Sequence, residues 1–334
     1  MPITWNGDLV VYAHGYVATT QPVALQNLTL ADGTSLPGLV QALGYAFATT
    51  SYRANGLVVL EGVDDLRHLI AAFDNSAPTP RRRTLVTGAS EGALIATLLT
   101  ERYPDLVSGT LAACGPIGDF RAQIDYVGDF RVLFDYFFPS VLPGSPTEIP
   151  SALLAGWDST YAPRIAAALN NDPARALELM RVSHAAIDPP DVTGPTVTES
   201  ALALLWYNVF GTNDAAAKLG GNPFSNHARW YSGSTNDLRL NLLVRRVGAS
   251  SSALVAMRRY QTSARLARPV VTLHTTADPV VPVWQSLIYW LRADTATRGQ
   301  FTFIPTARYG HCSFTASELL TAFFLLALRV NAAP

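Results

Sequence analysis

The chain has 334 residues, of which 49% are hydrophobic and 15% are charged, and its formal net charge at pH 7 is −1. A chain of this length and composition can bury a large core, either as one domain with an insertion or as two domains. Because no cationic cluster exceeds Arg81-Arg82-Arg83, we expect neither a nucleic-acid partner nor binding to an anionic membrane surface.

The first third of the chain alternates predicted strands with predicted helices. Helical spacing is found around Val63–Phe73 and again in the segment that ends near Tyr103. Short apolar runs separated by helices are typical of a mostly parallel sheet with helices on both faces. The runs that predict strands here are Leu9–His14, Ala46–Ser51, Arg83–Thr87 and Leu106–Cys114.

The sequence Gly88-Ala89-Ser90-Glu91-Gly92 lies between the third of these strands and the helix that follows it. A serine exposed at a sharp turn from strand to helix needs small neighbours, and glycines two positions before and after Ser90 provide them. The same turn directs the backbone N–H of Glu91 toward a reacting carbonyl group. This context favours a nucleophilic Ser90 over a serine in an ordinary surface turn.

From about Asp119 to Ala267 the strand alternation stops and helical patterns replace it. We therefore predict a helical cap insertion at 119–267 within a core formed by 1–118 and 268–334. Helices are expected from Asp172-Pro173 onward, over Glu199–Phe210 and over Ser251–Tyr260, with Pro- and Gly-rich connections at Pro139–Pro150 and Asp188–Pro195.

The segment Asp125–Phe138 is unusually aromatic and is expected near the start of the cap, above Ser90. Two interpretations stay open, because these rings can line a hydrophobic cleft or can hold the cap on the core. Trp206 and Tyr207, in a later cap helix, carry the same ambiguity. The candidate substrate contacts are Tyr126, Phe130, Phe134, Phe138 and Trp206.

The strand and helix alternation returns after Arg268. Strands are predicted at Val270–Thr275 and Gln300–Pro305, with a helix from Trp284 to Leu291 between them. A capping-box pattern, Thr315-Ala316-Ser317-Glu318, opens the last helix. Its apolar run, Leu319 to Leu328, is too short to cross a bilayer, so we expect a buried helix and no membrane span. The first residues contain no signal-peptide pattern, and the localisation stays open between cytoplasmic and secreted after removal of a leader.

A nucleophilic serine needs a base and a carboxylate that orients the base. Asp278 directly follows the strand Val270–Thr275, and His311 follows the next strand, so both loops reach the same edge of a parallel sheet. The alternative for Asp278 is a turn that only starts a helix. Asp294 is the nearest competing acid, but it lies beyond the helix, at the opposite end of the sheet.

The other histidines are expected to be structural. His14 is predicted to support the loop after the first strand, and His274 to point into the core or toward a neighbouring loop. The sequence contains no H-x-H or H-E-x-x-H pattern, no Walker-A sequence and no G-x-G-x-x-G after the first strand, so neither a metal nor an organic cofactor is expected.

The chain has two cysteines, Cys114 and Cys312, which rules out a disulfide framework or a Cys-rich metal site. Each follows a predicted core strand. Unpaired thiols are the expectation, and a single disulfide at the rim of the site is the alternative.

The order Ser90, Asp278, His311 is the order associated with α/β-hydrolases. Together with LVVYAHGY at Leu9–Tyr16, the ADPVVP loop and the GHC loop, it resembles the α/β-hydrolase superfamily over residues 1 to about 118 and 267 to 334. The resemblance implies an α/β-hydrolase fold with the cap inserted between core strands. It further implies that the backbone N–H of Tyr16, or of Val17 if the loop is shifted by one residue, joins that of Glu91 in an oxyanion hole. Only about eight residues precede Leu9, so the sheet is expected to be shortened, or its first strands trimmed.

These residues predict a cofactor-independent serine hydrolase of carboxylic esters, acting through an acyl-enzyme on apolar or aromatic small-molecule substrates. One alternative is a serine exopeptidase or amidase of the prolyl-peptidase type, in which Asp125, Asp129, Asp135 or Glu91 would bind a substrate amine. Another is a binding protein that keeps the fold without the chemistry. The oligomeric state stays open.

Overall fold

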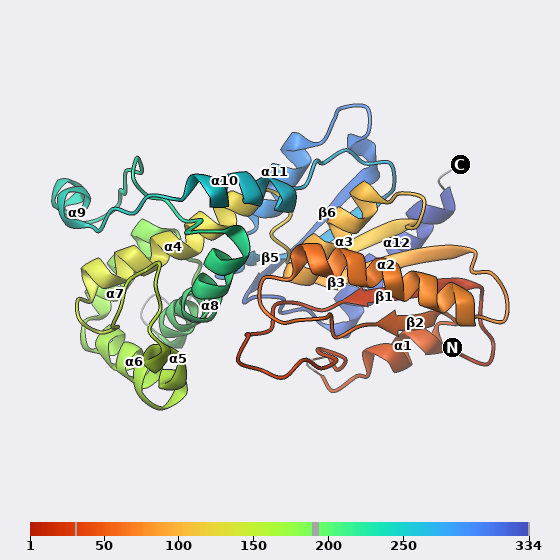
Figure 1. Cartoon of the computed structure of the whole chain (residues 1–334), viewed down its shortest axis with the longest axis horizontal. Helices are drawn as coiled ribbons and strands as arrows, with labels where there is room; N and C mark the ends of the chain where they lie inside the picture. Colours follow the sequence, from red (N-terminus) through yellow and green to blue (C-terminus); the bar gives the residue numbers. More distant parts are fainter. Residues whose placement is uncertain (31, 189–193, 333–334) are drawn as a thin grey trace.

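The computed structural model describes residues 1–30, 32–188 and 194–332. Its core is a six-stranded sheet in the order β2-β1-β3-β4-β5-β6, and all five neighbouring pairs in that sheet are parallel (Figure 1). The predicted fold class, a doubly wound sheet with helices inserted between core strands, is therefore confirmed. The strands are β1 (Asp8–Ala13), β2 (Ala46–Thr49), β3 (Arg83–Ala89), β4 (Gly109–Ala113), β5 (Val270–Ala277) and β6 (Phe301–Tyr309).

Helices cover both faces of the sheet because successive residues of a strand point to opposite faces. In β1, Val10 packs in one hydrophobic cluster with α1 and α12, whereas Leu9 and Val11 pack in another with α2 and α3. On the face that α2 and α3 cover, α11 packs against the end of the sheet that contains β5. These helices are α1 (Leu36–Ala42), α2 (Val59–Ser76), α3 (Glu91–Arg102), α11 (Trp284–Arg292) and α12 (Ala316–Ala332).

Several boundaries differ from the prediction. β4 begins at Gly109 instead of Leu106, because the Leu106 N–H turns back to the carbonyl of Tyr103. β6 continues to Tyr309, beyond the predicted end at Pro305, and α1 has no counterpart among the predicted elements. The predicted capping box is confirmed, since Thr315 and Glu318 exchange side-chain to backbone hydrogen bonds at the start of α12.

The insertion between β4 and β5 is helical, and most of it lies to the left of the sheet in Figure 1. The helix α8 is much longer than the predicted 199–210. Residues 189–193 of the predicted connection Asp188–Pro195 lie outside the described part of the chain. The inserted elements are α4 (Phe120–Phe137), α5 (Ser151–Ala155), a π-helical turn (Trp157–Tyr161), α6 (Ala162–Asn171), α7 (Pro173–Ser183), α8 (Pro195–Leu219), α9 (Asp237–Leu243), α10 (Ser251–Met257) and a 3₁₀ turn (Arg258–Tyr260).

The inserted helices contribute to two different hydrophobic cores. The middle of α4 and α8 forms a core of its own, centred on residues such as Phe130, Phe134 and Leu205. The end of α8 and the helix α10 pack with α2 and α3 instead, through residues that include Leu219 and Met257. Phe120, the first residue of α4, packs in the same cluster, so the cap is anchored on the sheet layer at both ends of its sequence.

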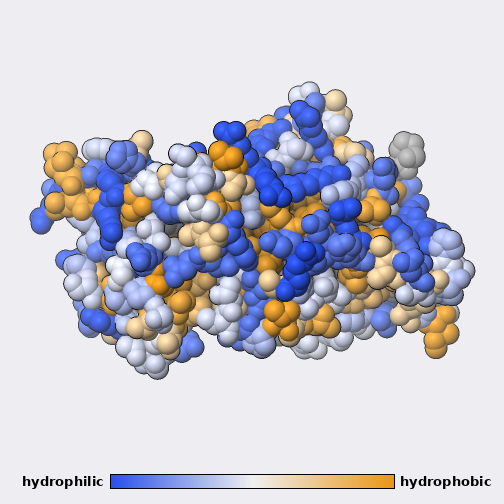
Figure 2. Space-filling view, viewed as in Figure 1, coloured by the Kyte–Doolittle hydropathy of each residue, from blue (hydrophilic) through white to orange (hydrophobic). Residues whose placement is uncertain are grey.

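The surface mixes polar and apolar side chains, and Figure 2 shows an apolar group at the far end of the cap, over α9. Leu238, Leu242 and Leu243 are exposed there. None of the helices in the described ranges is both long enough and apolar enough to cross a membrane.

Candidate active site

Ser90 lies at the sharp turn between β3 and α3, as predicted. Its backbone has φ +56° and ψ −125°, a region that residues other than glycine seldom adopt. A side chain at Gly88 would clash with the backbone of Gly92, and one at Gly92 would clash with the backbone of Ala13. Glycine at both positions therefore permits the close packing of strand, turn and helix that presents Ser90.

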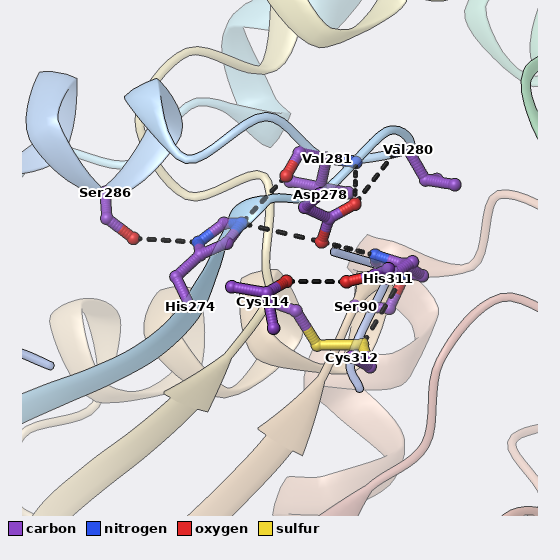
Figure 3. The surroundings of a disulfide bond; sticks show 11 residues. Ser90, Cys114, His274, Asp278, Val280, Val281, Ser286, His311 and Cys312 are labelled. Carbon is purple, nitrogen blue, oxygen red and sulfur yellow. Dashed lines mark hydrogen bonds and ion pairs between the residues drawn. A yellow bond between two sulfur atoms is a disulfide. The ribbon is translucent and has the colours of Figure 1, made fainter. Parts of the chain in front are cut away.

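Three predicted side chains meet at the carboxyl edge of the sheet (Figure 3). The Nε2 atom of His311 lies 2.9 Å from Oγ of Ser90, and its Nδ1 atom lies 2.8 Å from Oδ2 of Asp278. Since a carboxylate only accepts, Nδ1 donates to Asp278 and Nε2 of the neutral ring accepts from the Ser90 hydroxyl. This is the geometry that a nucleophile, a base and an orienting acid require.

The Asp278 carboxylate is buried and held in one orientation. Its Oδ1 atom accepts hydrogen bonds from the N–H groups of Val280 and Val281, at 2.9 and 3.0 Å, which leaves Oδ2 for His311. Such an arrangement keeps the carboxylate fixed while the histidine changes charge.

His274 supports the same loop from the strand β5. Its Nε2 atom donates to the Val281 carbonyl at 2.8 Å, so its Nδ1 atom accepts from the Ser286 hydroxyl at 3.0 Å. Burial lowers the pKa of His274 below its usual value, which favours this neutral form. The expectation that His274 points toward a neighbouring loop is confirmed, and that loop carries Asp278.

Cys114 and Cys312 form a disulfide bond beside Ser90 and His311 (Figure 3). The expectation of unpaired thiols is therefore wrong. Cys114 directly follows β4, and Cys312 lies in the loop that follows β6. The carboxyl ends of parallel strands meet at one edge of the sheet, so the two residues come together despite their separation in sequence. The Sγ atom of Cys312 lies 3.5 Å from Nε2 of His311.

The loop after β1 lies directly against Ser90, as the predicted oxyanion hole requires. A Cβ atom placed on Gly15 would lie 3.2 Å from Cβ of Ser90. His14 supports this loop as expected, because its Nδ1 atom contacts the Gly15 carbonyl at 2.8 Å. Within the described residues, the backbone N–H groups of Tyr16 and Glu91 make no hydrogen bond and are free to donate to a ligand.

Two cavities meet at Ser90, and both are lined by Tyr16, Ser90 and Tyr207. The first, which we call the core cavity, has a volume of about 360 Å³ and lies between the sheet and the helices α1 and α12. The second, which we call the cap cavity, has a volume of about 150 Å³ and lies between the start of α3 and the helices α4 and α8.

The five predicted substrate contacts line neither cavity, so this prediction is wrong for the space beside Ser90. Four of them, Tyr126, Phe130, Phe134 and Phe138, are buried in the core of the cap, and Trp206 packs on Tyr16 and Phe210. The other interpretation, that these rings hold the cap on the core, fits Tyr126, whose hydroxyl donates to the Pro279 carbonyl at 2.8 Å. The three phenylalanines pack within the cap itself.

Tyr207 is the aromatic residue that reaches the site. Its hydroxyl group contacts the Ser90 side chain, and burial raises its pKa to about 12, so the phenol stays protonated at neutral pH. The sequence prediction named Trp206 and missed Tyr207 as a contact. Neighbouring residues of a helix point about 100° apart, and the rotation of α8, which the local pattern does not determine, decides which of the two faces Ser90.

The side chain of Glu91 is buried beside the cap cavity. Its Oε1 atom accepts from the Val58 N–H at 3.2 Å, and its Oε2 atom has no partner among the described residues. Burial raises the pKa of Glu91 from 4.5 to about 8, so the protonated carboxyl predominates at neutral pH.

The three aspartates proposed to bind a substrate amine are engaged elsewhere. Asp125 and Asp129 form ion pairs with Arg229, and Asp135 forms one with the buried Arg131. None of the three lines the core cavity or the cap cavity.

A shared metal ion requires several histidine, cysteine or carboxylate side chains that lie close together. In the described ranges one group meets this condition, and it consists of Cys114, His311 and Cys312. Both sulfur atoms belong to the disulfide and so offer no thiolate ligand.

No protein-family model matches this chain, and no curated protein matches it. Solved structures do resemble it. An esterase from Aspergillus oryzae has 14% identity and a TM-score of 0.49, covering 93% of this chain and 69% of its own. A monoacylglycerol lipase from Paleococcus ferrophilus has 13% identity and a TM-score of 0.45, and the match covers 97% of this chain and 95% of the lipase. An acylaminoacyl peptidase has 14% identity and a TM-score of 0.46, and the match covers 97% of this chain and 38% of the peptidase. These similarities are too weak to assign a reaction, and the fold is identified here by its strand order and by the Ser90 turn.

Proposed function

We propose that this chain, which has the α/β-hydrolase fold, is a serine hydrolase of carboxylic esters. The observation that carries the proposal is the continuous contact from Ser90 through His311 to Asp278, at 2.9 and 2.8 Å. A serine hydroxyl is a weak nucleophile at neutral pH, and this contact supplies both the base and the group that orients it.

In the proposed mechanism, Oγ of Ser90 attacks the ester carbonyl while His311 takes the hydroxyl proton. The N–H groups of Tyr16 and Glu91 stabilise the negative charge that develops on the carbonyl oxygen. His311 then gives its proton to the leaving alkoxide, and an acyl-enzyme stays on Ser90. Water activated by His311 hydrolyses this intermediate, and Asp278 stabilises the imidazolium in both halves of the reaction.

The cavity walls support an uncharged, apolar substrate. Among the residues that line the two cavities, Glu91 is the one with a carboxyl or strongly basic side chain, and its raised pKa keeps it mostly protonated at neutral pH. A substrate ammonium or carboxylate group would therefore enter either cavity without a counter-charge, which is costly.

Of the four acids that the exopeptidase alternative requires, Asp125, Asp129 and Asp135 are paired with arginines away from Ser90. Glu91 lines the cap cavity, but its raised pKa of about 8 leaves it mostly protonated at neutral pH and so a poor partner for an ammonium group. The binding-protein alternative predicts a fold without turnover. Both alternatives are decided by the experiment that tests the proposal.

The experiment compares initial hydrolysis rates of nitrophenyl esters and aminoacyl nitroanilides for the wild type and for Ser90→Ala. We expect ester turnover that Ser90→Ala reduces at least about 10³-fold, with an unchanged melting temperature and little anilide turnover. Ser317→Ala, which removes an exposed hydroxyl from α12, is the matched control and is expected to keep full activity.

Three results would contradict the proposal. Ester turnover retained by Ser90→Ala would exclude Ser90 as the nucleophile. Preferred turnover of anilides would favour the peptidase. The absence of all turnover in a folded wild-type protein, together with no labelling of Ser90 by a fluorophosphonate, would favour the binding protein.

A further inference from the structure

The two cavities share Tyr16, Ser90 and Tyr207 in their walls, so an ester bound at Ser90 has space for one half in each. From the proposed function, on which this step rests, we infer that the alcohol half occupies the core cavity and the acyl half occupies the cap cavity. The structure thereby assigns a substrate class, an ester of a long apolar alcohol with a short acyl group.

The position of His311 decides the orientation. The leaving oxygen must lie within hydrogen-bond reach of His311, because that residue protonates it. His311 lines the core cavity and is not part of the cap cavity wall, where Glu91 is found instead. The departing alcohol is therefore on the core side, and the acyl group that stays bonded to Ser90 extends to the cap side.

The two volumes set the sizes of the two halves. The core cavity, at about 360 Å³, is more than twice as large as the cap cavity, at about 150 Å³. The core cavity therefore accommodates the longer half of an ester and the cap cavity the shorter half. The acyl half is then the shorter one.

The walls of the core cavity specify an uncharged alkyl group. α1 and its C-cap residue contribute Leu36, Leu39 and Leu43, and α12 contributes Leu320 and Phe323. No aspartate, glutamate, lysine or arginine lines this cavity among the described residues. The side chains from α1 are only partly buried, so an alkyl chain in the cavity would cover apolar surface that the fold leaves open.

The test measures kcat/KM by titration of the released acid for two series of esters. The first keeps a butyryl group and lengthens the alcohol from methanol to dodecanol, and the second keeps ethanol and lengthens the acyl group from acetyl to dodecanoyl. We expect kcat/KM to rise at least tenfold along the alcohol series and to fall at least tenfold for acyl groups beyond about six carbons. The reverse pattern would overturn the assignment.

Two matched variants test which cavity each half of the substrate occupies. Leu39→Trp fills the core cavity and Val127→Trp fills the cap cavity, and neither residue touches Ser90, His311 or Asp278 in the proposed mechanism. Leu39→Trp is expected to lower kcat/KM for dodecyl butyrate at least tenfold more than kcat/KM for methyl butyrate. Val127→Trp is expected to lower kcat/KM for ethyl hexanoate at least tenfold more than kcat/KM for ethyl acetate. If Leu39→Trp instead shortens the preferred acyl group, the orientation is wrong.

An inhibition measurement on the wild-type protein gives a result that does not depend on whether the variants fold. Dodecanol is expected to inhibit competitively, with an inhibition constant at least tenfold below that of dodecanamide, an uncharged analogue of a long acyl group. Equal or stronger inhibition by dodecanamide would overturn the assignment. Failure of this assignment differs from failure of the proposed function. If only the assignment is wrong, Ser90-dependent ester turnover persists with the opposite chain-length preference. If the proposed function is wrong, Ser90-dependent ester turnover is absent.

Discussion

Cys312, the residue after His311, is covalently bonded to Cys114 at the end of β4, 198 residues earlier in the chain. The bond connects the loop of the proposed base to the central part of the sheet, next to β3, the strand that Ser90 directly follows. The position of His311 relative to Ser90 thus depends on a crosslink as well as on hydrogen bonds.

Removal of this crosslink is expected to affect both stability and turnover. For Cys114→Ala/Cys312→Ala we expect the free energy of unfolding, measured with urea, to fall by about 2–5 kcal/mol, since the bond closes a long loop. We expect kcat/KM to fall about 10- to 100-fold, because a small displacement of His311 is costly. Wild-type protein treated with a reductant should reproduce both changes. Unchanged stability in the double variant would show that the bond does not form in solution.

The orientation of His311 is tested by Asp278→Asn. Asparagine can still accept from the N–H groups of Val280 and Val281 but cannot stabilise an imidazolium, so we expect kcat to fall about 10³- to 10⁴-fold with little change in melting temperature. Asp294→Asn, at the opposite end of the sheet, is the matched control. A loss in Asp294→Asn equal to that in Asp278→Asn would reject the assignment of the acid.

The contact between Tyr207 and Ser90 is tested by Tyr207→Phe. The phenol stays protonated at neutral pH and lies at the junction of the two cavities, so its loss removes one hydrogen bond near the reacting atoms. We expect kcat/KM to fall about tenfold, the size of one hydrogen bond between uncharged groups. Trp206→Phe, one position earlier and outside both cavities, should keep its activity within a few fold. Equal effects in both variants would indicate a role in packing only.

The buried Glu91 makes stability depend on pH. Its pKa is about 8 in the folded protein and near 4.5 in the unfolded chain, so the folded state binds more protons between these values. The contribution of Glu91 to stability is therefore full below about pH 4.5 and is lost as the pH rises toward 8. The slope is at most about 1.4 kcal/mol per pH unit.

Glu91→Gln removes this dependence and keeps an oxygen that can accept from the Val58 N–H. The stability of the variant relative to the wild type, from urea unfolding, is expected to rise from pH 5 to pH 8. A difference that does not change with pH would mean that Glu91 is ionised normally in the folded protein.

The sequence by itself determined the sheet layer and the residues that meet at Ser90. Apolar runs separated by helical patterns specify parallel strands, and parallel strands bring their carboxyl ends to one edge. Ser90, Asp278 and His311 each follow such a strand, so their meeting could be predicted without knowing any distance.

Only the tertiary structure decided which neighbours surround these three residues. The pairing of Cys114 with Cys312 and the choice of Tyr207 over Trp206 depend on the rotation and approach of elements far apart in the chain. The core cavity depends on the space left between α1, α12 and the sheet, and α1 itself was not predicted. Aromatic residues can build a cap or line a cleft with the same local pattern, because packing between helices, and not periodicity within one helix, determines which side chains a substrate would meet.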